Sequence, residues 1–149
     1  MVKYILPEET LNLRSRVLRN GQPLAQCIFP TDEQGFHLGV VDNDQIVCIA
    51  SFYPNDYPEK GKGGYKLRGM ATAPEFAGKG FGNLLIKFAI NELIAANASY
   101  IWCNARSSAI GFYTKLGFEL VTEEFELPGI GMHFNMIYNL KDDEYNRSI

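Results

Sequence analysis

Three glycines at the start of a long apolar run constrain this chain more than any other feature. Gly78, Gly80 and Gly82 open the segment 78–97, whose remainder is apolar on nearly every side. Glycine loses the most backbone entropy on folding, so three in five positions indicate a geometric requirement. The apolar run predicts a helix that a sheet largely covers. The glycines before it are either a tight turn or a loop whose backbone comes close to a ligand.

The other segments alternate between strand and helix patterns. We expect helices at 7–20, 81–97 and 107–118, and strands at 2–6, 36–42, 45–54, 65–73, 99–105, 118–127 and 131–140. The order β-α-β-β-β-α-β-α-β-β predicts an α/β fold with a mixed central sheet flanked by helices. A chain of 149 residues without repeats or linkers predicts a single domain, 1–149.

Composition excludes several classes of protein. The formal net charge of -3 gives no reason to expect nucleic acid or an anionic membrane surface as a partner. Cys27, Cys48 and Cys103 are odd in number and far apart, which argues against a disulfide framework and against a metal site. The N-terminal segment lacks an apolar signal core, and no run is long enough to span a membrane. We therefore expect a reduced, cytoplasmic protein.

The glycine segment has the chemistry of an anion site. Free N–H groups and the positive dipole end at a helix start favour an anion, and glycines let those groups approach phosphate. The spacing is not that of a P-loop, because Asn83 and Leu84 follow Gly82 where a lysine and a hydroxyl are needed. It also differs from the dinucleotide fingerprint G-x-G-x-x-G. On this feature alone, a ligand loop and a structural turn remain equal alternatives.

The surrounding sequence resembles the acyl-CoA loop of the GNAT superfamily of acetyl-CoA-dependent N-acetyltransferases. In that family a strand leads into Q/R-x-x-G-x-G/A and then a helix; here residues 75–80 read EFAGKG, with Gly82 and Asn83 continuing the pattern. The segment "NARSSAIGFYTKLGFE" (104–119) is similar to the family's second block. The resemblance spans nearly the whole chain and implies a mostly antiparallel sheet. Glu75 and Ala77 depart from it, and a carboxylate at position 75 would repel a pyrophosphate.

The resemblance implies that main-chain groups hold acetyl-CoA as co-substrate. The implied cofactor-binding residues are Met70, Ala71, Thr72, Gly78, Lys79, Gly80, Phe81, Gly82, Asn83 and Asn104. A backbone N–H near Met70 and Ala71 would face the charge that develops on the acetyl oxygen. Read without the family, 65–73 is a core strand, Phe81 is a packing residue and Asn104 is a helix cap.

Two residues are the catalytic candidates. Tyr113 matches the family tyrosine that often lies near the CoA sulfur, and a phenol with a pKa of about 10 can protonate a leaving thiolate. His133 follows the "PGIG" turn, where the family's last two strands border the acceptor site, so it is the first candidate for substrate contact or base. Either side chain is also consistent with an interior structural role. Further candidates for the base are His37, Glu123, Glu124 and Glu126.

The arginines do not determine which amine is the acceptor. Arg14, Arg16 and Arg19 fall on the first expected helix, and Arg68 falls on the strand before the glycine loop. They fit either an acidic substrate or a solvated helix face, and the second reading is the simpler one.

Three functions compete at this stage. The first is an N-acetyltransferase acting on a small-molecule or peptide amine. The second is a non-catalytic acyl-CoA-binding sensor, and the third is a nucleotide-phosphate binder of other chemistry. Exposed final strands also suggest pairing across a homodimer.

Overall fold

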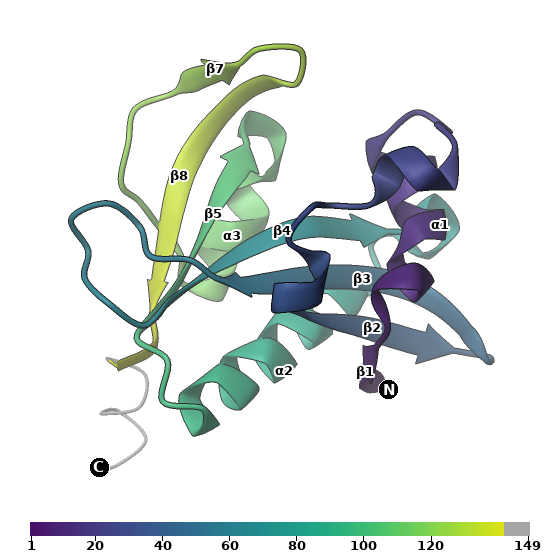
Figure 1. The fold of residues 1–149 in the computed structure, drawn as a ribbon, viewed down its shortest axis with the longest axis horizontal. Coiled ribbons are helices and arrows are strands. Elements are labelled where there is room, and N and C mark those ends of the chain that lie inside the picture. The colour runs from purple at the N-terminus through teal and green to yellow at the C-terminus, as the bar shows by residue number, and fades with distance from the viewer. Residues whose placement is uncertain (142–149) are drawn as a thin grey trace. The chain divides into compact units, whose positions relative to one another are not determined.

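The computed structural model describes residues 1–141, which fall into two compact units (Figure 1). The first unit comprises Met1–Pro54 and Leu67–Glu92, and the described part of the second comprises Asn55–Lys66 and 93–141. The strands are β1 (Val2–Ile5), β2 (Phe36–Asp42), β3 (Gln45–Pro54), β4 (Gly64–Thr72), β5 (Tyr100–Arg106), β6 (Glu119–Leu120), β7 (Phe125–Leu127) and β8 (Gly131–Asn139). The helices are α1 (Leu11–Leu13), α2 (Phe81–Ala95) and α3 (Ile110–Leu116). Among the described residues, no helix combines the length and apolarity that a membrane crossing requires.

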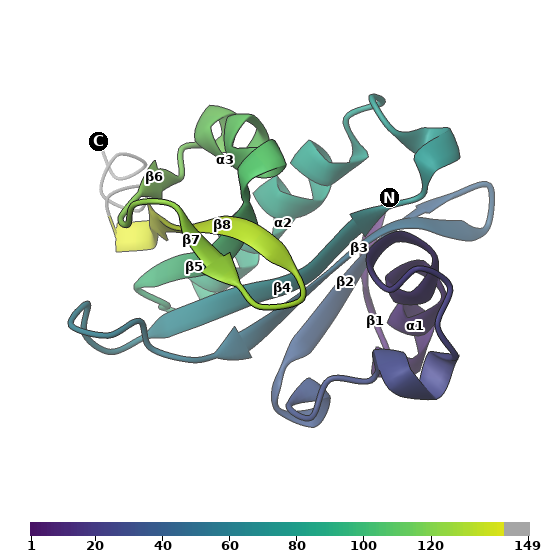
Figure 2. The same cartoon turned by 90° about the horizontal axis from the view of Figure 1, so that it is seen from above.

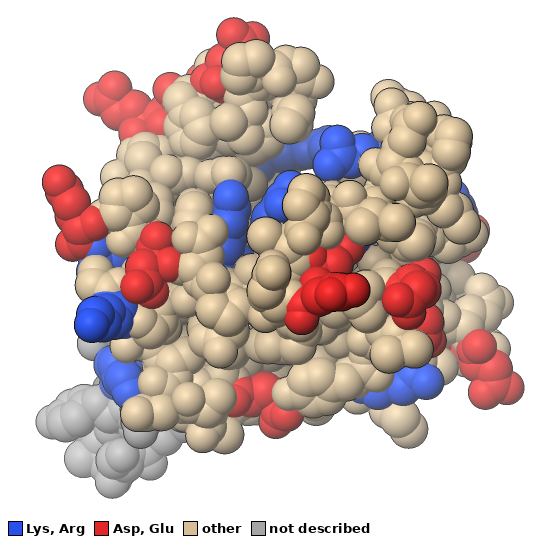
Figure 3. Space-filling model, in the orientation of Figure 1, with Lys and Arg blue, Asp and Glu red and all other residues tan. Residues whose placement is uncertain are grey.

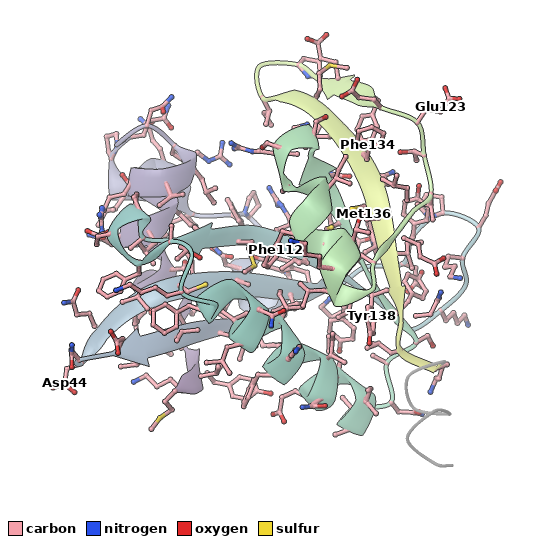
Figure 4. All side chains as sticks on the ribbon, turned by 180° about the vertical axis from the view of Figure 1, so that it is seen from behind. Asp44, Phe112, Glu123, Phe134, Met136 and Tyr138 are labelled. Atoms are coloured by element: carbon pink, nitrogen blue, oxygen red, sulfur yellow. The ribbon has the colours of Figure 1, made fainter. Side chains whose placement is uncertain are left out.

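The first unit is built on the strand order β1-β2-β3-β4. β2 pairs antiparallel with β1 and with β3. Asn43 and Asp44, at the tip of the β2–β3 hairpin (Figure 4), both have positive φ, at 48° and 63°. Two such residues form the type I′ turn that matches strand twist, and the strands predicted at 36–42 and 45–54 are confirmed with their bounds.

The two helices of this unit cover opposite faces of the strands (Figure 2). On the α1 face, Leu13 packs with Ile49 of β3 and Ala71 of β4 in one apolar cluster. On the α2 face, Phe88 meets Tyr4 edge to face, with ring centroids 6.2 Å apart. The alternation of side chains along β3 therefore serves two cores, as expected for a strand covered on both sides.

The second unit is built around β5 and β8. β5 pairs in parallel with Gly64–Lys66, the start of β4, and antiparallel with β8. β6 and β7 both pair antiparallel with β8. Phe134, Met136 and Tyr138 lie along the β8 face that α3 covers (Figure 4). The predicted class, a mixed and mostly antiparallel sheet flanked by helices, is confirmed; the single domain stays a prediction.

Two predicted elements are broken in the structure. The expected helix 7–20 consists of a 3₁₀ turn at Pro7–Thr10, the short α1 and a π turn at Arg14–Leu18. The expected strand 118–127 is divided into β6 and β7, because Thr122 accepts a hydrogen bond from Asn135 N–H through its side chain at the break. Gly117 caps the end of α3 with a left-handed φ of 106°, a conformation that glycine adopts readily.

Candidate active site

The glycine loop of the first unit is shaped by its backbone. Ala77 at φ -65°, ψ 148° and Gly78 at φ 76° have the angles of a type II β-turn, whose third position favours glycine. Gly80 follows at φ 84°. A Cβ added at Gly78 or Gly80 would meet no atom within 4 Å, so packing does not demand glycine there. The backbone angles demand it, and the loop surface stays open to a ligand.

The loop leads directly into the first turn of α2. Leu84 N–H donates to Gly80 O at 3.0 Å, which makes it the first hydrogen bond of this helix. The N–H groups of residues 80–83 precede that bond and have no partner inside the helix. They carry the positive end of the helix dipole, so this end of α2 suits an anion. Lys79, exposed in the loop, adds a cation with its Nζ 5.2 Å from the centre of the Phe76 ring.

The carboxylate of Glu75 is neutralised locally. Arg16 Nη2 donates to both Glu75 oxygens at 3.0 Å, in an exposed ion pair. A hydrogen bond from its own backbone N–H and the bond from Arg16 lower the pKa of Glu75. The repulsion expected from a carboxylate at this position is therefore offset by an arginine from the π turn at Arg14–Leu18.

β4 brings three further predicted residues next to the loop. Ala71 is buried in the α1-side cluster, and Thr72 Oγ1 donates to Cys48 Sγ at 3.2 Å. Gly69, just before Met70, has φ 64° inside the strand. A left-handed glycine within a strand is typical of a β-bulge, which leaves one residue outside the regular hydrogen-bond ladder. The backbone of Gly69 thus departs from regular strand geometry next to Met70 and Ala71, where the resemblance implies the acetyl group.

A buried polar network on β3 and the π turn was not predicted from the sequence. Arg14 is fully buried, and its two Nη atoms donate to Asp32 at 2.8 and 3.0 Å. The same guanidinium donates to Ser51 Oγ, Tyr53 Oη and Cys27 O at 3.0 to 3.3 Å. The reading of Arg14 as part of a solvated helix face is therefore wrong. The π turn begins at this residue, which points inward.

The network fixes the charge of its members. Burial by itself raises the pKa of Asp32, but hydrogen bonds from Arg14, Tyr53 and Phe29 N–H outweigh burial and lower the pKa to about 2. Burial, reinforced by the hydrogen bond to Asp32, raises the pKa of Tyr53 to about 12. The carboxylate is thus held ionised and the phenol neutral, which stabilises one arrangement of hydrogen bonds.

The other predicted residues lie in the second unit. Tyr113, on α3, is 7% exposed and packs edge to face against Phe112 and Phe118, with centroids 5.1 and 5.2 Å away. Asn104, half-buried on β5, is paired in register with Asn135 of β8.

The histidines have structural partners. His133 is 3% exposed, and its Nδ1 lies 2.8 Å from Gly131 O. His37 is buried between Ser51 Oγ at 2.7 Å and Asp32 O at 2.9 Å, so it belongs to the Arg14 network. Of the acids, Glu124 accepts from Ser107 Oγ at 2.6 Å, and Glu123 and Glu126 are exposed.

The face of the second unit opposite α3 carries an aromatic group. Tyr57 packs edge to face on Trp102, with centroids 5.0 Å apart, and Lys66 Nζ lies 4.7 Å from the centre of the Trp102 ring. Asn135 Nδ2 donates to Tyr57 Oη at 2.9 Å, while its buried Oδ1 has no partner. The packing of Tyr57 on Trp102 could not be predicted from the sequence.

Residues 1–141 hold no cluster of three His, Cys, Asp or Glu side chains arranged for a metal ion. On the surface shown in Figure 3, several basic side chains gather in the upper middle of the view, and acidic side chains are scattered around them.

Comparisons with known proteins agree with the resemblance. Residues 7–118 match the model of the acetyltransferase (GNAT) family. The Bacillus subtilis (strain 168) protein YitI, an uncharacterized N-acetyltransferase, is 40% identical over 143 residues, which are 94% of this chain and 96% of YitI.

Solved structures share the fold at lower identity. The ribosomal-protein-S18-alanine N-acetyltransferase of Escherichia coli has a TM-score of 0.75 at 16% identity, covering 94% of this chain and 93% of its own. The E. coli GNAT protein YhbS, solved in complex with CoA, has a TM-score of 0.73 at 17% identity, covering 98% and 84%. The family match and the YitI identity extend over most of the sequence. This chain therefore belongs to the GNAT family of N-acetyltransferases.

Proposed function

We propose that the protein transfers the acetyl group of acetyl-CoA to a primary amine by direct attack. The observation that carries this proposal is the glycine loop, whose left-handed backbone at Gly78 and Gly80 opens α2 with unobstructed N–H groups. Bound acetyl-CoA would supply a thioester, whose acetyl carbon bonds to the amine nitrogen as the carbon–sulfur bond breaks.

The loop fits the diphosphate of such a ligand. Six consecutive residues, 78–83, include three glycines and one lysine and no acid. Glu75, the nearest acid along the chain, is already paired with Arg16. Backbone N–H groups at a helix start hold phosphate oxygens without a side chain in the way.

In this proposal, β4 binds the acetyl end of acetyl-CoA. The left-handed φ of Gly69 departs from regular strand geometry beside Met70 and Ala71, and a bulge there would free their backbone groups for the ligand. A preorganised N–H there would stabilise negative charge on the carbonyl oxygen as the amine attacks.

The cysteines support direct attack over an acetylated thiol. Cys27, Cys48 and Cys103 are free and buried. Burial raises the pKa of Cys103 to about 12 and also raises the pKa of Cys48, so neither forms the thiolate that a nucleophile requires. Free thiols also suit a reducing, cytoplasmic setting.

Proton transfer is assigned to two side chains. Tyr113 Oη would donate its proton to the departing CoA thiolate and recover one from solvent afterwards. His133 would accept the proton that the amine loses on forming the amide bond. Asn104, on β5, would orient the ligand through its side-chain amide.

One experiment tests this assignment. Titration calorimetry measures CoA affinity, and thiol release over a panel of amines measures turnover. Tyr113→Phe should lower kcat about 100-fold, the lower range for general acid catalysis, and leave CoA affinity unchanged. Tyr4→Phe is the matched control, since it removes an exposed hydroxyl that donates to Glu92 and should keep full rate. If the Tyr113→Phe protein keeps the full kcat, Tyr113 is not the proton donor.

The alternative is a CoA-binding sensor without catalysis. CoA binding with no thiol release on any amine would favour the sensor. Binding of ATP in place of CoA would contradict both the acetyltransferase and the sensor proposals.

A further inference from the structure

Three arginines gather around one aromatic ring in the first unit. The guanidinium carbons of Arg14, Arg68 and Arg19 lie 3.8, 4.2 and 5.7 Å from the centre of the Phe29 ring. We call these four residues the arginine cluster. A ring face attracts each cation only modestly, which does not by itself explain the gathering of three like charges.

The charges of the cluster are incompletely balanced. Asp32 neutralises Arg14 through two hydrogen bonds. Within residues 1–141, the side chains of Arg19 and Arg68 make no ion pair and no hydrogen bond. Both are half-buried. The cluster therefore holds two guanidinium groups that lack an anion and have lost part of their water.

The physical cost falls on Arg68. Burial foremost, with the charges of Arg19 and Arg14 adding to it, lowers the pKa of Arg68, although Tyr53 and Asp32 act in the opposite direction. Like charges brought together in a partly dry site oppose folding, and an arriving anion relieves them. Strained electrostatics of this kind concentrate at functional sites.

One donor within the cluster has no partner. Arg14 Nε is buried and makes no hydrogen bond. Gly69 lies close against the cluster, because a Cβ there would be 3.4 Å from this Nε and 3.1 Å from the Phe29 ring and would crowd both groups. Glycine at position 69 therefore lets β4 pass beside a buried N–H whose unsatisfied state is costly.

We propose that the arginine cluster binds a carboxylate carried by the amine acceptor. Arg68 and Arg19, the two half-buried members, would donate to the carboxylate oxygens, and the positive charge of the buried Arg14 would add to the attraction. The planar guanidinium fork matches a carboxylate geometrically and forms short, charge-assisted hydrogen bonds. The acceptor class is therefore amino acids and peptides with a free carboxylate near the reacting amine.

This inference rests on the proposed function through the position of Arg68. Arg68 stands two residues before Met70 on β4, about 7 Å along a strand that rises roughly 3.3 Å per residue. A carboxylate held by Arg68 would thus place an amine a few bonds away near the acetyl position.

The kinetic test compares matched amines. β-Alanine, L-leucine and glycylglycine are each assayed against the corresponding C-terminal amide. Arg68→Gln and Arg19→Gln should raise KM for the carboxylates at least tenfold, with kcat nearly unchanged and KM for the amides unaltered. Comparing each variant with its own pair of amines removes differences in amine basicity. Lys87→Gln, which removes an exposed charge from α2, is the control and should change neither KM.

A thermal melt separates binding from folding. Arg68→Gln should not lower the melting temperature, because it relieves repulsion among cations. A variant that melts earlier and loses both amine classes equally would make Arg68 structural and overturn the proposal.

A binding test works without turnover. N-acetyl-β-alanine and its amide are titrated into the CoA-saturated protein while the arginine Nε–Hε NMR signals are followed. The carboxylate should move the signals of Arg14 and Arg68, and the amide should not. Equal responses to both compounds, or an unchanged response in Arg68→Gln, would overturn the carboxylate site.

The two proposals fail differently. Absence of shifts in the backbone amides of 78–83 on adding CoA would defeat the proposed function. If CoA moves those amides and the carboxylate moves no arginine signal, the proposed function stands and the carboxylate site falls.

Discussion

The glycine loop and the arginine cluster belong to the same unit and prepare for anions in opposite ways. The loop is exposed, is built from backbone N–H groups, and needs glycine for its φ angles. The cluster is largely buried, is built from guanidinium side chains, and depends on Asp32 and Tyr53 for its order. We infer that the loop is nearly independent of fold stability, whereas the cluster is coupled to it.

The largest effect should come from breaking the buried ion pair. Asp32→Asn leaves Arg14 buried with an uncompensated charge, which should lower the free energy of unfolding by about 3 kcal/mol or more. Glu75→Gln makes the same chemical change in the exposed pair with Arg16 and should be indistinguishable from wild type. Urea unfolding of both variants measures the difference. Equal losses would contradict the contrast between buried and exposed charge.

Lowering the pH should destabilise the Arg14 network, because it protonates Asp32. The pKa of Asp32 is about 2 in the folded protein and ordinarily 3.8, so the unfolded chain binds the proton more readily. The contribution of Asp32, roughly 2 kcal/mol, is complete above pH 4 and is lost as the pH falls towards 2. Unfolding free energies across that range should show this slope, and Asp32→Asn should flatten it. An equally steep slope in the variant would place the titration elsewhere.

A substitution in the glycine loop should change the affinity for CoA and leave the core packing unchanged. Gly80→Ala forces a side chain into φ 84°, at a cost of about 1 kcal/mol, and should weaken CoA binding at least tenfold by displacing the N–H groups. Gly61→Ala is the matched control, with φ 98° and no atom within 4 Å of the new Cβ. Calorimetry should find CoA affinity intact in that control. Similar weakening in both variants would mean that the loop has no special role.

The smallest effect should come from Lys79. Its ammonium is exposed, and an exposed charge contributes little beside several backbone hydrogen bonds. Lys79→Gln should weaken CoA binding by about threefold at low salt and by less at high salt. A loss as large as that of Gly80→Ala would mean that side-chain charge dominates the loop.

What the sequence predicted depended on local signals. The hairpin of β2 and β3 was predicted to the residue, because apolar runs flank a polar turn whose residues tolerate positive φ. The role of glycine at 78 and 80 followed from the same backbone rule.

The Arg14 network was missed for a physical reason. Arg14 and Asp32 are 18 residues apart, and Asp32 stands in a segment without periodicity. Side-chain pairing over that distance leaves no local pattern, and propensity predicts a regular helix where the π turn aims Arg14 inward. The site residues implied by the resemblance, Tyr113 and His133 among them, stay predictions.

The most direct measurement is a crystal structure of the protein with CoA. Our account predicts diphosphate oxygens within about 3 Å of backbone nitrogens between residues 78 and 83. Electron density for CoA at any other place, with this segment unoccupied, would contradict it.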